Sequence, residues 1–411
     1  MRVAIVHYWL VSMRGGEKVL EALCDLYPDA DIFTLVCDPD EVSQKIARHR
    51  IVTSFIDRLP GGRKHYKSLL PLMPFALEHF DLSEYDLVIS SESGPAKAVV
   101  TRPDALHVCY CHSPMRYIWD LYPDYMRNSG RITRFALGFF APLLRQWDVT
   151  TAVRVDAFIA NSDFVAKRIR KYYGRKSEVI HPPVSLTDFD IKGVTGDYYL
   201  CAGQLVGYKR VDIAVEAFSR MNKKLVVIGD GAELARLKKL AGPTIIFTGR
   251  ASLQQLQEHF SACRALVFPG QEDFGIVPLE VMAAGRPVIA YGRGGALETV
   301  VDGHTGIFFD DQSADALVAA VQRFETMGPQ FEDRAAIRAH AQRFSTETFK
   351  SRIHAFIATK LLGIQAGPRL DGVADPDRPA SAHVLETHDV VFAEVAAGLP
   401  SMMARATVPG S

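Results

Sequence analysis

The sequence predicts an α/β protein built from two doubly wound domains that face each other across a cleft. Short apolar runs alternate with helical stretches along nearly the whole chain, which is typical of parallel sheets covered by helices on both faces. The alternation occurs twice, on either side of residues 181–199, where prolines, glycines and polar residues interrupt it. A chain of 411 residues is also too long for one ordinary core. Because open α/β sheets bind ligands at the carboxyl ends of their strands, we expect the site in the cleft.

Six strands are expected in each half. In the first they lie at residues 3–6, 31–35, 51–55, 87–90, 107–111 and 157–160, and in the second at 198–202, 224–228, 244–248, 265–269, 287–290 and 306–309. We therefore assign residues 1–184 and 185–344 to two Rossmann-like domains. Residues 345–362 are expected to form a helix that packs back towards the first domain. Residues 363–411 have the composition of a linker or disordered extension with at most a short helix, either dispensable for chemistry or a membrane or partner contact.

The composition is that of a globular protein without a global charge bias. With 47 basic and 47 acidic residues the formal net charge is zero, which argues against nucleic acid as a partner. Six cysteines in so long a chain indicate reduced thiols in a cytosolic compartment. Cys109 and Cys111 would share one face of a strand, but no second cysteine or histidine pair has ligand spacing. Structural thiols are therefore expected rather than a metal site.

No targeting or membrane-spanning segment is expected. The stretch MRVAIVHYWL runs directly into the polar SMRGGEK, which does not fit a signal peptide. No uncharged apolar run approaches the roughly 20 residues that span a bilayer. We expect a cytoplasmic protein that is at most peripheral on the inner face of the cytoplasmic membrane.

Two loops have the features of anion sites. Gly15 and Gly16 follow the first strand where a helix begins, so backbone amides could approach a diphosphate there. The three-glycine dinucleotide fingerprint is absent, and a plain glycine turn explains the pair equally well. Lys209 and Arg210 open a helix in CAGQLVGYKRVDIAVEAF. Because two cations at a helix amino terminus oppose the macrodipole, an anion site is favoured there over a solvated charge pair.

Two further loops carry polar groups suited to sugars. In EDFGIVPLE, a helix that begins near Gly275 would have Glu272 just before it and Glu280 about one and a half turns into it. Carboxylates accept hydrogen bonds from paired hydroxyls, although a helix-terminus charge and an exposed glutamate explain the two about as well. His112 follows a predicted strand in YCHSPMRYIWDLY. At a cleft edge it is a reasonable sugar contact, while a lone histidine is more often structural.

Together these loops resemble those of the retaining nucleotide-sugar glycosyltransferases of family 4, which have the two-domain GT-B fold. The resemblance covers roughly residues 1–362. Its most specific element is EDFGIVPLE followed by MAAGRPVIAYGRGGALETVVDGHTGIFF, in combination with the early Gly-Gly pair and Lys209. It implies a hexosyltransferase whose first domain, residues 1–184, lies on the acceptor side and whose second, residues 185–344, binds the nucleotide sugar.

The resemblance also implies a role for each motif residue. The expected catalytic residues are His112 on the transferred sugar, Lys209 on the diphosphate and Glu272 on the sugar hydroxyls. Gly16 would lie against the diphosphate, and Glu280 would bind the ribose hydroxyls. The donor-binding residues are expected to be Gly15, Gly16, Gln204, Lys209, Arg210, Phe274, Gly275, Ile276 and Glu280.

One position departs from the family pattern. Many members have arginine where this chain has Gln204, so one of two cations that share the diphosphate charge is missing. Three explanations stay open: Arg210 or another basic residue compensates, the donor is held differently, or activity is low.

The mechanism that the resemblance implies uses no metal and no other cofactor. A departing nucleoside diphosphate develops negative charge, which Lys209 and helix amides would stabilise. The usual picture of retention is same-face attack, with the departing phosphate taking the acceptor proton. Three Asp-x-Asp pairs could hold Mg²⁺ on a diphosphate but are expected to lie away from the cleft motifs: Asp29/Asp31, Asp38/Asp40 and Asp188/Asp190.

The amino-terminal stretch VHYWLVSMRGGEKVLEALCDLYPDADIFTL and the later LVGYKRVD resemble bacterial mannosyltransferases of surface-polysaccharide assembly. The resemblance implies GDP-mannose as donor and a saccharide or polyprenyl-diphosphate-linked acceptor. UDP-glucose and other UDP-sugars remain open. Two competing functions are a nucleotide-sugar 2-epimerase and a sugar-nucleotide-binding protein without catalysis.

Two segments, residues 58–80 and 127–147, interleave cations with large apolar residues. In the second, Phe135, Phe139 and Leu143 recur at helical spacing. This pattern suits contact with an anionic membrane surface and a lipid-linked acceptor. Helices packed on the core, with basic side chains snorkelling to solvent, are the alternative.

Overall fold

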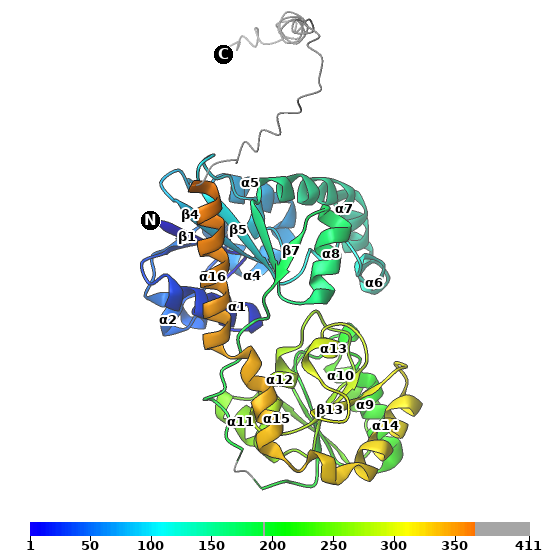
Figure 1. Ribbon diagram of the computed structural model, residues 1–411. Coiled ribbons are helices and arrows are strands. Elements are labelled where there is room, and N and C mark those ends of the chain that lie inside the picture. Colours follow the sequence, from blue (N-terminus) through cyan, green and yellow to red (C-terminus); the bar gives the residue numbers. More distant parts are fainter. Residues whose placement is uncertain (192–193, 366–411) are drawn as a thin grey trace, which may run out of the picture. The chain divides into compact units, whose positions relative to one another are not determined.

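The computed structural model describes residues 1–191 and 194–365 (Figure 1). Two parallel sheets with helices on both faces lie within one compact unit, Met1–Gln365, which confirms the predicted α/β class. The tail predicted at residues 363–411 begins inside a helix that ends at Gln365. The rest of that tail lies outside the described residues.

The first sheet has seven parallel strands in the order β3-β2-β1-β4-β5-β6-β7. The strands are β1 Val3–His7, β2 Asp31–Thr34, β3 Ile51–Thr53, β4 Leu87–Glu92, β5 Leu106–Cys111, β6 Ala157–Ala160 and β7 Ser177–Val179. Strand β7 was not predicted, because it is a three-residue edge strand without a buried apolar run. The strand predicted at 51–55 ends early, because the Ser54 hydroxyl accepts the Ile56 N–H and caps a helix.

The second sheet has six parallel strands in the order β10-β9-β8-β11-β12-β13. All six were predicted to within two residues at each end. They are β8 Tyr199–Ala202, β9 Leu225–Ile228, β10 Ile245–Gly249, β11 Leu266–Phe268, β12 Val288–Tyr291 and β13 Gly306–Phe309.

Helices follow most strands and cover the sheets (Figure 1). In the first half they are α1 Gly15–Leu26, α2 Gln44–Ala47, α3 Phe55–Arg58, α4 Gly62–His65, α5 Met73–Glu78, α6 Tyr122–Asn128, α7 Arg131–Thr151 and α8 Asp163–Tyr173. In the second they are α9 Val211–Met221, α10 Leu234–Leu240, α11 Leu253–Ala262, α12 Ile276–Ala283, α13 Ala296–Thr299, α14 Ala314–Thr326, α15 Arg334–Ala341 and α16 Thr346–Gln365.

Helix α16 belongs by packing to the first sheet, although it follows the second in sequence. Phe349, Ile353 and Ile357, one turn apart, are buried in the core formed by β1, β4, β5 and α1. The Phe349 ring meets the ring of Tyr110 edge-on at 5.6 Å between centroids. The chain therefore crosses between the two halves twice, and Val184 and Ser345 pair where the two crossings run side by side.

The winding of each sheet reverses between two neighbouring strands, β1 and β4 in the first and β8 and β11 in the second. Loops that leave such strands at their carboxyl ends diverge and leave room for a ligand. The two glycines Gly15 and Gly16 follow β1, Lys209 follows β8, and Glu272 follows β11. The topology therefore explains why residues so distant in sequence gather at one place.

Candidate active site

The amino termini of two helices, one from each half, meet at the predicted site. Helix α1 begins at Gly15, and α12 begins at Ile276 after Gly275, whose φ of +89° favours glycine. A Cβ atom on Gly15 would lie 2.7 Å from Cδ1 of Ile276, so these termini are in contact. Free N–H groups and the positive ends of two helix dipoles are thus brought together.

Gly16 is required by a second close approach. A Cβ atom there would lie 2.3 Å from the hydroxyl oxygen of Tyr8, which is buried and cannot move aside easily. Burial raises the pKa of Tyr8, so the phenol stays neutral. The backbone at Gly16 is therefore left without a side chain of its own, as a site for a bulky anion needs.

Lys209 and Glu272 form an ion pair with 3.0 Å between Nζ and Oε1. Lys209 ends the short 3-10 turn Gly207–Lys209 between β8 and α9. Glycines leave room for it, because a Cβ on Gly203 would lie 3.0 Å from its Nζ and one on Gly270 2.8 Å from its Cα. Burial lowers the pKa of Lys209, but Glu272, with smaller contributions from Tyr208 and Cys201, outweighs burial and leaves that pKa raised, so the lysine is charged.

Gln204 and Arg210 flank this pair differently. Gln204 is exposed and lines a small hollow together with Lys209 and Glu272. Arg210 turns to Asp212, with 3.1 Å from Nε to Oδ1 and 3.3 Å from Nη2 to Oδ2. A bidentate pair of this kind engages the guanidinium within its own helix start.

Glu280 lies partly buried on α12, about a turn and a half past Gly275, as predicted. Burial raises its pKa to about 7; Lys18 of α1 opposes this shift and Asp188 adds to it. Asp188, from one of the Asp-x-Asp pairs, thus acts electrostatically on Glu280. Within the described residues no group of three histidine, cysteine or acidic side chains could hold a metal ion.

His112 directly follows β5 and is held by two hydrogen bonds. Its Nε2 lies 2.9 Å from the Ser91 hydroxyl, and its backbone N–H donates to the backbone carbonyl of Glu92 at 2.7 Å. Burial, with a smaller contribution from His7, lowers the pKa of His112 to about 3. The imidazole is therefore neutral near pH 7 and suited to hydrogen bonding rather than to donating a proton as an acid.

The side chain of Phe274 belongs to the core of the second half. Its ring is buried and stacks on His181 at 5.2 Å between centroids. The loop around it rests on glycines: Gly295 donates its N–H to the Glu272 carbonyl at 2.9 Å, and a Cβ there would lie 2.2 Å from Cα of Phe274. The stretch GRGG thus packs against this loop, and a side chain at Gly295 would not fit.

Two family models match consecutive parts of the chain, one in each half. Residues 13–188 match "Glycosyltransferase Family 4", and residues 190–344 match "Glycosyl transferases group 1". The chain belongs to glycosyltransferase family 4. Its fold is the GT-B fold, as the resemblance implied.

Curated relatives of this glycosyltransferase include mannosyltransferases. A GDP-mannose-dependent alpha-(1-6)-phosphatidylinositol monomannoside mannosyltransferase of Mycobacterium tuberculosis is 34% identical over 140 residues, 30% of this chain and 36% of the relative. A D-inositol 3-phosphate glycosyltransferase of Geodermatophilus obscurus is 30% identical over 242 residues, 49% of this chain and 52% of the relative. The chain therefore spans about a third to a half of the length of the curated relatives that it matches.

Solved structures share the fold of this glycosyltransferase at low identity. HepE of Anabaena in complex with UDP superimposes with a TM-score of 0.64 at 15% identity, covering 87% of this chain and 100% of HepE. Sucrose-phosphate synthase of Thermosynechococcus elongatus gives a TM-score of 0.67 at 18% identity, covering 88% and 100%.

Three charged residues join the loop between β11 and α12 to the first half, and they were not identified from the sequence. Asp273 ion-pairs with Arg168 of α8 and, at 3.4 Å, with Arg116. The Ser162 hydroxyl also donates to the Asp273 carbonyl at 2.6 Å, and Arg168 binds Asp120 at 2.6 Å. Asp273 lies inside EDFGIVPLE and Arg168 inside KRIRKYYGRK, but nothing in either pattern marks them as partners.

A fourth missed residue, Glu298 of α13, caps helix α8. Its carboxylate accepts the N–H groups of Asp163 at 2.8 Å and Phe164 at 3.2 Å, and lies 3.1 Å from Nε2 of His181. A carboxylate at a helix amino terminus satisfies free N–H groups and complements the dipole. The second half thus completes a helix of the first.

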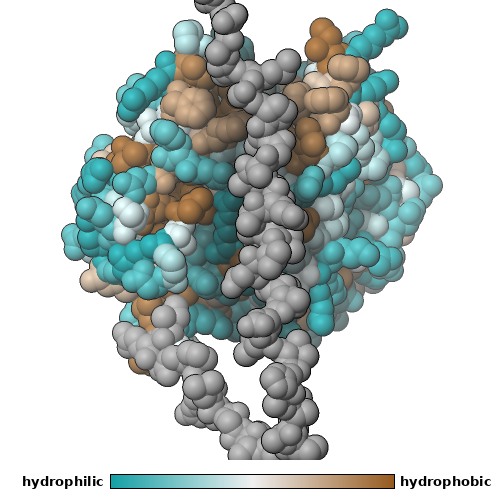
Figure 2. Space-filling view, turned by 90° about the horizontal axis from the view of Figure 1, so that it is seen from above, coloured by the Kyte–Doolittle hydropathy of each residue, from teal (hydrophilic) through white to brown (hydrophobic). Residues whose placement is uncertain are grey.

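The apolar stripe predicted on residues 127–147 is exposed on α7. Phe135, Phe139 and Leu143 are 80%, 61% and 55% exposed, and Ile132 extends the stripe at 87%. Core packing is therefore excluded for these side chains. Figure 2, which views the end of the molecule where α5 and α7 lie, shows hydrophobic patches among hydrophilic surface. No helix among the described residues is long and apolar enough to cross a membrane.

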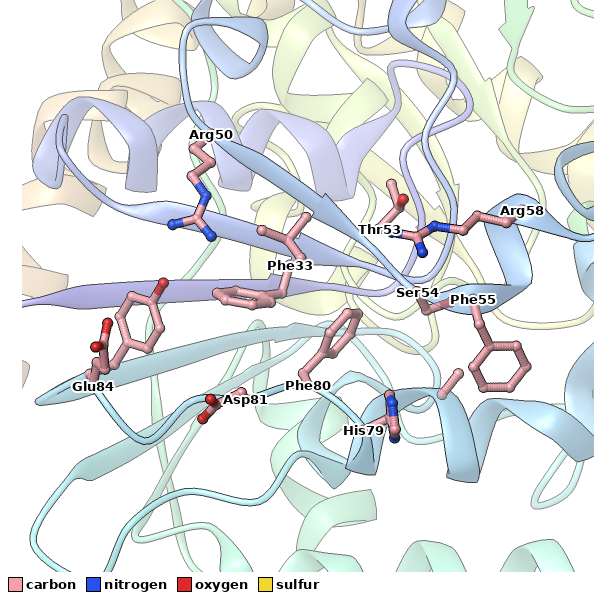
Figure 3. Close-up of a pocket in the computed structure, with 13 residues that line it drawn as sticks. Phe33, Arg50, Thr53, Ser54, Phe55, Arg58, His79, Phe80, Asp81 and Glu84 are labelled. Atoms are coloured by element: carbon pink, nitrogen blue, oxygen red, sulfur yellow. The ribbon is translucent and has the colours of Figure 1, made fainter.

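A second hollow lies apart from the predicted donor-site residues and is lined in part by the predicted segment 58–80. A cavity of about 400 Å³ beside β3 and α5 is lined by aromatic rings and cations (Figure 3). Phe33 and Phe80 form its floor, and Arg50 and Arg58 lie at opposite ends. None of the motif residues borders it.

Proposed function

We propose that this family 4 enzyme transfers mannose from GDP-mannose, with retention of configuration and without a metal, to a saccharide acceptor in polysaccharide or lipopolysaccharide assembly. The contact of Gly15 with Ile276 carries the proposal, because it joins two helix amino termini beside the two loops that carry Lys209 and Glu272. Such a site suits a diphosphate. Mannosyltransferases among the relatives support the choice of sugar.

Each side chain has a part in the transfer. Lys209 and the helix N–H groups stabilise the charge that grows on the diphosphate as the bond from the anomeric carbon to the phosphate oxygen breaks. When a diphosphate takes the place of Glu272 beside Lys209, the Glu272 carboxylate accepts hydrogen bonds from sugar hydroxyls. His112 is neutral and positions the sugar. The acceptor hydroxyl attacks from the face the diphosphate leaves, and its proton passes to the departing phosphate oxygen.

A transfer assay tests this. The enzyme is incubated with radiolabelled GDP-mannose, UDP-glucose or other sugar nucleotides, with mannose-terminated oligosaccharide acceptors, with and without EDTA. We expect α-linked product, identified by anomeric NMR couplings, from GDP-mannose in both conditions. Transfer from a UDP-sugar alone would show that the donor is not GDP-mannose. Loss of transfer activity with EDTA, restored by Mg²⁺, would exclude the metal-free route. Conversion of the sugar nucleotide into its epimer without an acceptor would indicate an epimerase. Binding of the sugar nucleotide without turnover would indicate a binding protein.

The exposed α7 stripe supports a lipid-linked acceptor, reached at an anionic membrane surface. Ile132, Phe135 and Phe139 lie on one face, beside the exposed cations Arg131 and Arg134. Apolar side chains inserted below the headgroups and cations above them are the usual basis of peripheral binding.

Flotation with vesicles tests this membrane contact. At low salt the protein should float with phosphatidylglycerol vesicles and not with phosphatidylcholine vesicles. The double variant Phe135→Ser/Phe139→Ser should stay at the bottom. Val194→Ser, which removes an equally exposed apolar side chain from the other half, should float like the original chain. No difference between the two variants would exclude the α7 stripe as the contact.

A further inference from the structure

The donor site as described has one cation too few. A nucleoside diphosphate sugar carries two negative charges, and Lys209 supplies one positive charge. Position 204 is glutamine, and Arg210 is bidentate to Asp212. The site therefore needs a second cation from elsewhere in the chain.

Arg116 lies where such a cation would be useful. It belongs to the loop between β5 and α6, four residues after His112. Its guanidinium carbon lies 4.9 Å from the centre of the Tyr208 ring, and Nη1 lies 3.4 Å from Oδ2 of Asp273. Tyr208 directly precedes Lys209, and Asp273 directly follows Glu272. Arg116 thus contacts the neighbour of each member of the Lys209–Glu272 pair.

The contacts of Arg116 leave donor capacity unused. Its side chain is 18% exposed, and its buried Nε has no hydrogen-bond partner. Asp273 is already paired closely with Arg168, so its single contact with Arg116 is the looser of the two. A guanidinium has five N–H groups arranged to bind a diphosphate in two places at once. The ring of Tyr208 holds the plane of Arg116 without using those groups.

Glu272 and Asp273 therefore act as neighbouring anions that hold two cations in position. Lys209 is held by Glu272 from the second half, and Arg116, which comes from the first, is held by Asp273. Both cations keep their charge: Glu272 keeps the pKa of Lys209 raised, and the pKa of Arg116 is raised by Asp273 despite its burial.

We propose that Arg116 binds the donor diphosphate and supplies the second positive charge that Gln204 lacks. The inference rests on the proposed sugar-nucleotide site. It makes the diphosphate a bridge between the halves, with Lys209 on one side and Arg116 on the other. Donor binding would then depend on a residue of the half that was assigned to the acceptor.

Calorimetry with GDP-mannose, and with UDP-glucose in parallel, tests this on the full chain. Arg116→Gln is compared with Arg264→Gln, a matched control in which an arginine also lies over a tyrosine ring, 5.4 Å from Tyr199, with a loose carboxylate contact at 3.8 Å. We expect Arg116→Gln to weaken binding at least tenfold and raise KM alike, and Arg264→Gln to stay within twofold. Arg116→Lys, which keeps the charge, should lie between them.

Restoration by a second substitution separates contact from a structural role. Adding Gln204→Arg to Arg116→Gln places a cation at the position the family usually uses, and should restore binding to within about threefold. Arg116→Gln that behaves like the control would overturn the inference. A decrease in kcat without a loss of donor affinity would also overturn it. So would a loss of affinity that Gln204→Arg does not restore although the variants have equal melting temperatures. Either result would mean that Arg116 acts by positioning the Asp273 loop. If the original chain binds no sugar nucleotide, the proposed function itself fails.

Discussion

Lys209 and Glu272 join the two loops at which the second sheet reverses its winding, with 3.0 Å between the ammonium and the carboxylate. The pair joins the loops that follow the neighbouring strands β8 and β11, and Gly203 and Gly270 lie against Lys209. It keeps a charged lysine in place at a site where a diphosphate would otherwise have to order a flexible side chain. A ligand that replaces Glu272 meets a cation that is already positioned.

Lys209→Ala is therefore expected to lower kcat/KM for the sugar nucleotide about a hundredfold to a thousandfold, because preorganised charge at a leaving group typically contributes that much. Steady-state kinetics with the donor found active measures it. Lys238→Ala, on the exposed part of α10, should leave kinetics unchanged. If Lys209→Ala retains near-normal turnover with an unchanged melting temperature, the diphosphate site has been misplaced.

Donor binding should depend on pH through Glu280. Its pKa is raised to about 7, and only the ionised carboxylate can accept both ribose hydroxyls. Raising the pH from 6 to 8 moves it from about a tenth to about nine-tenths ionised, so affinity for GDP-mannose should rise roughly tenfold. In Glu280→Gln the affinity should no longer depend on pH and should stay at the low value that the original chain shows at pH 6.

Asp188→Asn separates Glu280 from other titrating groups. Asp188 raises the pKa of Glu280, so its removal should lower that pKa and move the midpoint of binding to lower pH. Calorimetry at half-unit steps shows the shift. A midpoint that stays in place in Asp188→Asn, or a pH dependence that survives in Glu280→Gln, would contradict the assignment.

The fold was predictable because its signals are local and repeated. Strands such as residues 87–90 and 306–309 are continuous apolar runs, and a parallel sheet buries them on both faces. The errors fall where a strand is short or meets a cap. Strand β7 is only three residues long, and Ser54 ends β3 through a single side-chain hydrogen bond. Neither feature changes the hydrophobic pattern.

The contacts between the halves could not be predicted in the same way. Lys209 and Glu272 lie in recognisable motifs, yet the partners of Asp273 and Glu298 lie more than 100 residues away. A sequence shows that Arg168 is basic but not that it is buried against two carboxylates. Such residues come together only in the folded protein, and one sequence alone does not reveal which distant residues are in contact.

The meeting of α1 and α12 predicts a specific double-substitution effect. Gly15→Ala would place a Cβ 2.7 Å from Cδ1 of Ile276 and displace the end of that side chain, so donor affinity should fall a few-fold, although alanine favours the helix itself. Ile276→Val removes that Cδ1 atom and should restore affinity in the double variant. The interaction free energy from the four affinities measures the contact. Purely additive effects would show that the termini do not meet.

The last prediction concerns the carboxylate of Glu298, which accepts N–H groups at the start of α8. Loss of a helix cap typically costs about 1–2 kcal/mol, and Ser162 still caps Val165 in its absence. Glu298→Ala should therefore lower the free energy of unfolding by about 1 kcal/mol, and Glu298→Gln by less because an acceptor oxygen remains. Urea unfolding followed by circular dichroism measures both, with Glu258→Ala on the exposed face of α11 as control. Equal stability of Glu298→Ala and that control would mean that the second half does not complete helix α8.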